Sequence, residues 1–151
     1  PYTTLFRSKG KIIITDRYHD SSVAYQFGGR NLYGTDMEKG VNLIYSFLNC
    51  HPGRTYLLDI PVEEGLSRIG FRLTDNPELE NESRLDRESK EFHHRVRQTY
   101  LDLARKDSQR IKVIDALQPI DVITEQITMD LETYLNKNFW DTPHKLKKFN
   151  P

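Results

Sequence analysis

Cysteine is almost absent from this chain, since Cys50 is the one cysteine among 151 residues. A single thiol cannot form an intrachain disulfide, so a disulfide-stapled fold is excluded and a reducing compartment is favoured. Long apolar runs are missing too, because none approaches the ~20 residues that cross a bilayer. These two absences lead us to expect a cytoplasmic protein that has no membrane partner.

Net charge is also missing. Lysine and arginine total 22, aspartate and glutamate total 22, and the formal charge is zero. A chain of this kind has no overall field that attracts nucleic acid or anionic lipid, so we expect neither as a partner. Any anion that it binds must be held locally, by clustered arginines. The length favours one domain with a substantial core.

Short apolar runs are present, and they indicate strands. Residues 11–15, 56–60 and 111–114 are rich in β-branched and aliphatic side chains, as is typical of parallel strands buried on both faces. Between and after them, apolar residues recur at helical spacing. That spacing predicts helices over residues 21–26, 37–48, 62–73, 92–103 and 122–135. Alternating strands and helices predict an α/β fold with a parallel sheet.

Ligands of such sheets bind beyond the carboxyl ends of the strands. Asp16 and Arg17 follow the first predicted strand directly. An aspartate there can hold water on a magnesium ion, and an arginine can fork onto phosphate oxygens. Behind them come hydroxyls at a helix start, a flat ring for a base and an amide for its edge: Ser21, Ser22, Tyr25 and Gln26. The competing interpretation is a surface Asp–Arg pair followed by a helix capped by Asp20 or Ser21.

A second group of cations surrounds an acidic loop predicted at residues 74–83. Its members are Arg68, Arg72, Arg84 and Arg87. The first two are four residues apart and share one face of a helix. Phosphoryl transfer is catalysed mainly by positioning and by cations around the migrating group, so a mobile loop of arginines would suit a lid. Alternatively, this is a solvated helix whose arginines pair with Glu64, Glu82 or Glu88.

Four collinear segments together resemble the bacterial thymidylate kinases. IIITDRYHDSSVAYQFGGR is similar to that family's strand, DRY motif and following helix, and TYLLDIPVEEGLSRI to its next strand and the helix before the lid. SRLDRESKEFHHRVRQTYLDLA resembles the end of the lid with its helix, and KVIDALQPIDVI the last strand and the adenine-side loop. Ser83 and Asp86 depart from the family, which often has Asp and Glu there.

The resemblance implies phosphoryl transfer from ATP to dTMP with Mg²⁺, in a homodimer. It makes Asp16 the acid on the magnesium side, acting through water, and Arg17 the clamp on the dTMP phosphate. On the acceptor side it implies contacts to the nucleoside from Ser21, Ser22, Tyr25 and Gln26. On the donor side it implies that Arg68 and Arg72 contact ATP and that Arg72 or Arg84 reaches the transferring phosphoryl. Ala116 and Leu117 would border the adenine.

No segment of the 151 residues reads G-x-x-x-x-G-K-[ST], and Gly28-Gly29 is not followed by Lys-Ser or Lys-Thr. The resemblance places that loop upstream, after a strand at the centre of the sheet. We therefore expect an incomplete P-loop nucleoside monophosphate kinase sheet, lacking the P-loop strand and helix, and a chain that alone is poorly folded and inactive. The expected domain covers residues 9–135, with a non-native scar at 1–8 and a tail at 136–151.

Two other functions remain open. A related nucleotide or deoxynucleoside kinase would share the scaffold, although Gln26 and the EFHHRVR segment favour thymidylate kinase. A non-catalytic nucleotide-binding relic would have lost the P-loop in evolution. The irregular start of the chain argues against such a settled module.

Overall fold

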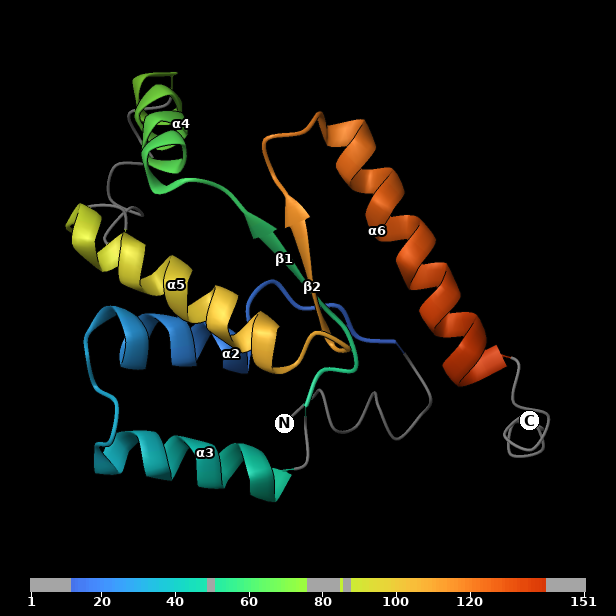
Figure 1. The fold of residues 1–151 in the computed structure, drawn as a ribbon, viewed down its shortest axis with the longest axis horizontal. Coiled ribbons are helices and arrows are strands. Elements are labelled where there is room, and N and C mark those ends of the chain that lie inside the picture. The colour runs from blue at the N-terminus through green and yellow to red at the C-terminus, as the bar shows by residue number, and fades with distance from the viewer. Residues whose placement is uncertain (1–11, 49–50, 76–84, 86–87, 141–151) are drawn as a thin grey trace. The chain divides into compact units, whose positions relative to one another are not determined.

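The computed structural model describes residues 12–48, 51–75, 85 and 88–140. In chain order the elements are α2 (His19–Ser22), the π-helix η1 (Val23–Gly29), α3 (Asp36–Leu48), β1 (Thr55–Asp59), α4 (Val62–Asp75), α5 (Lys90–Lys106), β2 (Ile111–Asp115), α6 (Ile120–Leu135) and the π-helix η3 (Asn136–Trp140) (Figure 1). They form two compact units. The larger holds α2, η1, α3, α4, α5 and the first residues of both strands, and the smaller holds the strand ends, α6 and η3.

The two strands form one parallel pair. The Thr55 amide donates to the Arg110 carbonyl (3.0 Å), and the Ala116 amide donates to the Asp59 carbonyl (2.9 Å). The paired positions advance together along both strands, which is the parallel arrangement. The α/β class with a parallel sheet is therefore confirmed, as are two of the three predicted strands.

The first predicted strand, at residues 11–15, is wrong for its described part. Residues 12–15 form no strand, and Ile14 is 86% exposed. A strand exists only with a hydrogen-bonded neighbour, and β1 is paired with β2. This outcome agrees with the expectation of an incomplete sheet. In that expectation, β1 and the segment that precedes Asp16 lack the central strand that would pair with both of them. Lys11 and the scar expected at residues 1–8 lie outside the described residues.

The core of the larger unit lies between η1 and α5. Ala24 of η1 packs there with Phe92 and Val96 of α5 in one buried cluster. Other buried apolar residues of this unit are Val23, Phe27, Val62, Ala104 and Ile111. Ser89 caps the start of α5, because its hydroxyl accepts a hydrogen bond from the Phe92 amide (3.2 Å). Arg105 and Lys106 occupy its last turn, where cations favour the helix dipole. The predicted amphipathic helix is confirmed, and its apolar stripe is the face that η1 covers.

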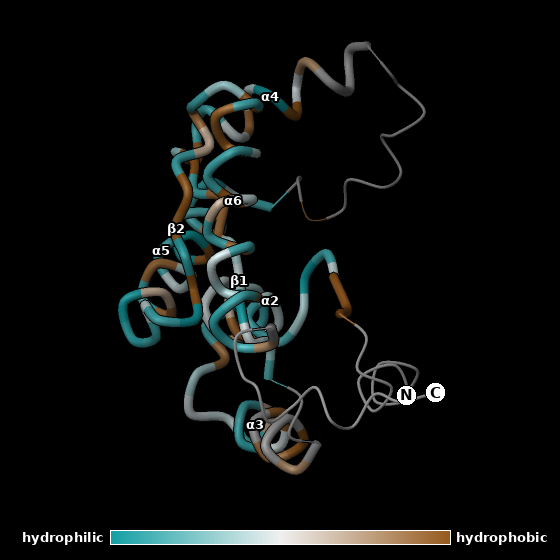
Figure 2. The backbone as a smooth tube through the Cα atoms, turned by 90° about the vertical axis from the view of Figure 1, so that its right-hand side faces the viewer, coloured by the Kyte–Doolittle hydropathy of each residue, from teal (hydrophilic) through white to brown (hydrophobic). Residues whose placement is uncertain are grey.

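α3 has an apolar face that no described residue of the chain buries. Met37, Leu43 and Ile44 are exposed, and Phe47 is 87% exposed. Figure 2 shows hydrophobic and hydrophilic residues on different sides of this helix. In the smaller unit α6 likewise has no buried residue. No helix among the described residues is long and apolar enough to cross a membrane.

The first five residues of the predicted tail at 136–151 are helical. η3 continues directly from α6, and the Asn138 amide donates to the Tyr134 carbonyl (2.7 Å). Residues 141–151 of that tail lie outside the described part of the chain.

Candidate functional site

The site starts at the bend before α2, which contains Asp16 and Arg17. Both residues are exposed. Arg17 has φ +63°, the left-handed region, which costs an ordinary residue about 1–2 kcal/mol. Its guanidinium carbon lies 5.0 Å from the centroid of the Tyr25 ring. Two predicted site residues from different elements are thus brought together, with a cation over an aromatic face.

Tyr100 of α5 connects two more of the predicted residues. Its hydroxyl donates to the Ser21 hydroxyl (2.6 Å), and its ring meets the Tyr25 ring edge-on at 6.3 Å. Tyr25 also contacts Phe92, with ring centroids 6.1 Å apart. Tyr100 lies in the helix predicted over residues 92–103, and the sequence indicated no polar role for it. The hydroxyl at the end of an apolar ring was the available signal.

Ser22 and Gln26, the other residues predicted to contact a nucleoside, are half-buried. Gln26 lies in η1, directly after Tyr25. A π-helix is rare and occurs frequently at functional sites, because its wider turn redirects side chains. The predicted ordinary helix over residues 21–26 is therefore corrected to a four-residue α-helix followed by a π-helix.

Arg95 fixes the end of that π-helix. Its Nε and one terminal nitrogen both donate to the Gly29 carbonyl, at 3.0 and 2.6 Å. The last carbonyls of a helix have no partner within the helix, so a forked donor satisfies this one. Arg95 belongs to the EFHHRVR segment, but its spacing did not reveal this contact across 66 positions of sequence.

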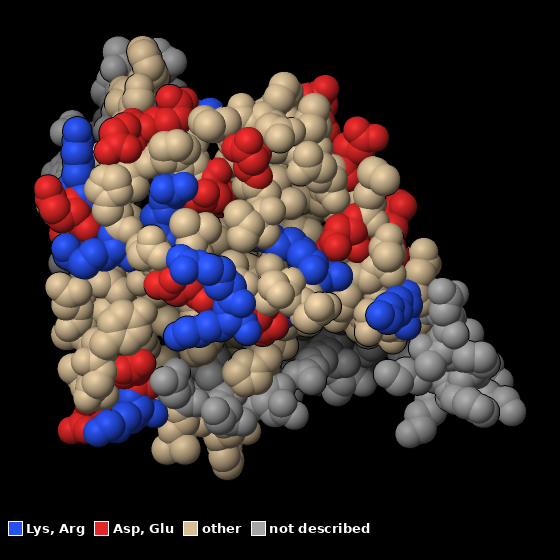
Figure 3. All heavy atoms as spheres, in the orientation of Figure 1, with Lys and Arg blue, Asp and Glu red and all other residues tan. Residues whose placement is uncertain are grey.

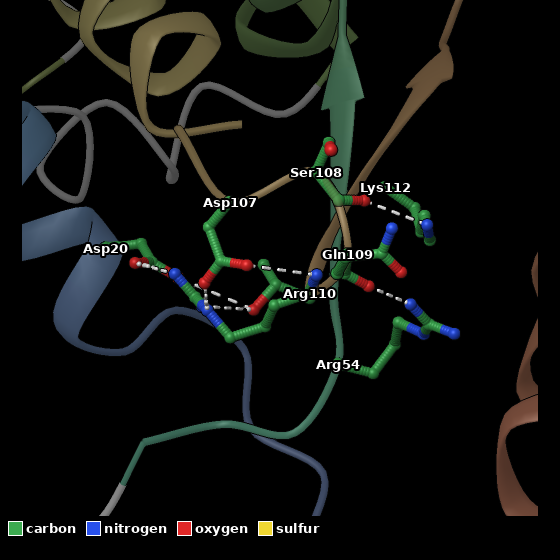
Figure 4. Close-up of polar contacts among 8 residues, drawn as sticks. Asp20, Arg54, Asp107, Ser108, Gln109, Arg110 and Lys112 are labelled. Atoms are coloured by element: carbon green, nitrogen blue, oxygen red, sulfur yellow. Dashed lines mark hydrogen bonds and ion pairs between the residues drawn. The ribbon is translucent and has the colours of Figure 1, made fainter. Parts of the chain in front are cut away.

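The predicted N-cap at Asp20 or Ser21 is wrong. The cap position of α2 is Tyr18, with no capping bond from its side chain. Asp20 is instead buried, and its carboxylate pairs with Arg110 (2.7 Å) (Figure 4). A cap is a local interaction, whereas this partner lies 90 positions along the chain. Local sequence therefore could not separate the two roles.

The arginines before the predicted lid are only partly described. Arg68 donates to Glu64 from one turn earlier in α4 (2.8 Å), and both side chains are exposed. This pairing is the one that the solvated-helix alternative predicts. Arg72 lies in the same helix, but its side chain is outside the described residues, as are Arg84 and Arg87 entirely. The lid therefore stays a prediction.

The predicted adenine-side residues follow β2 in the smaller unit. The Ala116 amide donates to the Asp59 carbonyl, and the Leu117 amide to the Asp115 carboxylate (2.9 Å). The Asp115 side chain thereby orders the turn after the strand. Leu117 is exposed. These contacts hold an apolar side chain open to solvent at the carboxyl end of β2.

Charge around these elements is mixed. On the face shown in Figure 3, acidic and basic side chains are interspersed. Within the described part of the chain, no group of three or more His, Cys, Asp or Glu residues is arranged to hold a metal ion. Asp16 contributes a single exposed carboxylate.

Comparison with known proteins decides the family. The family model described as thymidylate kinase matches residues 7–127. The chain belongs to the thymidylate kinase family. It is 43% identical over 130 residues to the thymidylate kinase of Syntrophotalea carbinolica, covering 85% of this chain and 58% of that protein. It is 46% identical over 119 residues to the thymidylate kinase of Leuconostoc citreum, covering 78% of this chain and 52% of that protein.

The chain thus spans between half and three-fifths of the length of these thymidylate kinases. The resemblance seen in its four motifs is confirmed, and so is the P-loop nucleoside monophosphate kinase fold class that comes with the family.

The buried phenol of Tyr100 predicts a pH dependence of stability. Burial raises the pKa of Tyr100, and the hydrogen bond to Ser21 opposes that rise only in part. A raised pKa in the folded state means that the neutral phenol stabilises the fold at pH values below the unfolded pKa of about 10. This stabilisation is lost as pH rises through the folded pKa. Urea unfolding at pH ~9 and pH ~11 measures this loss. Between these pH values the free energy of unfolding should fall less for Tyr100→Phe than for the wild type. Equal losses would contradict this assignment.

Proposed function

We propose that the full-length protein transfers the γ-phosphoryl group of ATP to dTMP, giving dTDP and ADP, and that it does so in the cytoplasm. One observation carries the proposal beyond family membership. Arg17 lies over the Tyr25 ring, and Tyr100 holds both Tyr25 and Ser21. A cation, a flat ring and a hydroxyl so close together suit the phosphate, base and sugar of one nucleoside monophosphate.

Arg17 would clamp the acceptor phosphate through its planar fork, as guanidinium groups do. Its left-handed backbone is consistent with this function, because strain is stored where a side chain must be aimed. The nucleoside would be held by Ser21, Ser22, Tyr25 and Gln26. On the donor side the proposal assigns Arg68 and Arg72 to ATP, Arg72 or Arg84 to the transferring phosphoryl, and Ala116 and Leu117 to the adenine ring.

Magnesium fits this arrangement. Mg²⁺ keeps several waters and is usually bound by one or two carboxylates together with substrate phosphates. The exposed Asp16 beside Arg17 is such a carboxylate, and it would hold the ion through water. When bound, the ion would neutralise charge on the phosphate oxygens. Arg17 would orient the acceptor independently of it.

The 151 residues alone are proposed to be inactive. They contain no G-x-x-x-x-G-K-[ST] segment to hold the donor phosphates. The full-length protein and residues 1–151 should therefore be compared in an assay of ADP release with ATP, Mg²⁺ and dTMP. Turnover by the full-length protein, and none by residues 1–151, supports both the proposed activity and the proposed inactivity of the shorter chain. Turnover with thymidine or another nucleotide but not with dTMP would favour a related kinase. Binding of dTMP without turnover would favour a relic.

We also infer a homodimer, formed through α3. The apolar face of Met37, Leu43, Ile44 and Phe47 is exposed in the isolated chain, and burial of such a face against a second copy would stabilise the assembly. Light scattering should show a dimer, and Phe47→Glu should give monomers. Glu38→Gln changes charge on the same helix outside the apolar face and is the control. A dimer that survives Phe47→Glu would remove α3 from the interface.

A further inference from the structure

At its C-terminal end α2 continues directly into η1, because Ser22 and Val23 both have right-handed helical backbone angles. Its N-terminal end has no side-chain cap. The Tyr18 side chain makes no capping hydrogen bond, and the Ser21 and Ser22 amides donate to the Tyr18 carbonyl at 3.0 and 3.4 Å. Just before α2, Arg17 occupies the unfavourable left-handed region. The surrounding structure must therefore hold the segment from Arg17 to Ser22 in place.

Asp20 and Arg110 provide the strongest such contact. Two guanidinium nitrogens of Arg110 donate to the two oxygens of the Asp20 carboxylate, at 2.7 and 3.0 Å. The two side chains are only 10% and 20% exposed. Bidentate charged pairs of this kind fix orientation as well as distance. The pair connects α2 to the residue that precedes β2 (Figure 4).

Neighbouring groups complete the network. The Thr55 hydroxyl donates to the Asp20 carboxylate (3.4 Å) and accepts from Arg110 (3.1 Å), which ties the start of β1 to the same pair. The remaining Arg110 nitrogen, Nε, donates to Asp107 (2.8 Å). The hydrogen bond to Asp20 raises the pKa of Arg110. Both Asp20 oxygens are thus engaged in this network.

We propose that Asp20 and Arg110 are positioning residues, which hold Arg17 and Ser21 in the geometry that binds the nucleoside monophosphate. This inference rests on the proposed function. Arg17 lies three residues before Asp20 and Ser21 comes next after it. The Tyr100–Ser21 hydrogen bond holds the segment to α5, and the Asp20–Arg110 pair holds it to the strands. Loss of the second tether lets the segment pivot about the first. A misplacement of about 1 Å costs up to 100-fold in rate.

The test is Asp20→Asn in the full-length protein. Asparagine keeps the shape of the side chain and removes its charge. The KM for dTMP should rise about 10- to 100-fold. The KM for ATP should change less than about 3-fold, because the contacts described for Asp20 and Arg110 include none of the residues proposed for the donor side. The matched control is Asp102→Asn, which changes the same residue type in an exposed pair with Arg105 (2.8 Å). The control should leave both KM values unchanged.

The double variant Asp20→Asn/Arg110→Gln separates positioning from stability. Asp20→Asn alone leaves the Arg110 charge buried with a weaker partner, and the second change removes that charge. The thermal midpoint should therefore recover in part while the KM for dTMP stays raised. If the KM returns to the wild-type value with the midpoint, the pair is only structural and the proposal is wrong. If the double variant does not fold, Arg110→Gln alone replaces it, because that change also removes the tether. A KM for dTMP near the wild-type value in Arg110→Gln would count equally against the proposal.

A second measurement distinguishes failure of the positioning proposal from failure of the proposed function. If the wild-type protein does not phosphorylate dTMP, hydrogen exchange at the Ser21 and Ser22 amides measures the positioning directly. Exchange at least about 10-fold faster in Asp20→Asn than in Asp102→Asn supports the tether, because fewer contacts then oppose local opening. Equal exchange in the two variants overturns it.

Discussion

Replacing Arg17 by alanine should reduce kcat/KM for dTMP by at least about 100-fold, the range seen when one preorganised donor to a reacting group is removed. Arg17 places a cation over the Tyr25 ring in the candidate site, and alanine removes both the charge and the planar fork. Arg17→Lys should recover only part of the loss, since an ammonium group keeps the charge but cannot form two parallel hydrogen bonds.

The backbone at Arg17 makes glycine a second, more informative replacement. Alanine keeps the strain of φ +63°, which is about 1–2 kcal/mol, whereas glycine adopts this conformation without that cost. Both variants lose the contact with Tyr25, worth about 0.5–1 kcal/mol at an exposed site. Arg17→Gly should therefore be at least as stable as Arg17→Ala in urea unfolding, and equally inactive.

Arg105→Ala is the control for these activity measurements. Arg105 is an exposed arginine in the last turn of α5, where it pairs with Asp102 and takes part in none of the site contacts described above. It should keep the wild-type kcat/KM. An Arg17→Ala protein with activity near that of Arg105→Ala would remove Arg17 from the phosphate site, and the proposed clamp would be wrong.

The helices could be predicted because each pattern is local. Apolar spacing placed the helices that became α3, α4, α5 and α6 to within a few residues. β1 and β2 were found from two apolar runs in the same way. The run at residues 12–15 has the same composition, yet it forms no strand in the structure. Composition shows that a segment suits a sheet, but a partner strand decides whether it pairs.

The candidate site was predictable only as far as its residues lie close in sequence. Asp16, Arg17 and Ser21 follow one predicted strand, and the resemblance to thymidylate kinases supplied their expected roles. The contacts from Tyr100, Arg95 and Arg110 cross 66 to 90 positions, and no local pattern indicates them. Asp20 shows the difficulty well, because an acid at a helix start is typical of a cap and also of a buried ion pair.

The packing of η1 on α5 predicts the largest effect on stability, at Gly28. A Cβ at this position would lie 2.0 Å from the Thr99 hydroxyl oxygen and 2.8 Å from the Thr99 Cβ. Both residues are buried, so neither can move into solvent. Gly28→Ala must push η1 away from α5, and overpacking of this kind costs about 1–3 kcal/mol or more. That is a large part of a typical total stability of about 5–15 kcal/mol.

Gly70 of α4 is a matched control, because it also lies in a helix. A Cβ at Gly70 would meet no atom within 4 Å. Alanine is the better helix former by about 1 kcal/mol, so Gly70→Ala should be stabilised. The same substitution should therefore change sign between Gly28 and Gly70. Urea unfolding of the two variants and the wild type measures the difference.

A compensating change identifies the cause. Thr99→Ala removes the hydroxyl and methyl groups that a Cβ at Gly28 would meet at 2.0 and 3.1 Å, although the Thr99 Cβ remains at 2.8 Å. Combined with Gly28→Ala it should recover part of the lost stability, and the two changes should be non-additive, as is typical of residues in contact. Additive effects would mean that the two helices do not approach each other here. The short contact between Gly28 and Thr99 would then not be what sets the position of Tyr25 beside α5.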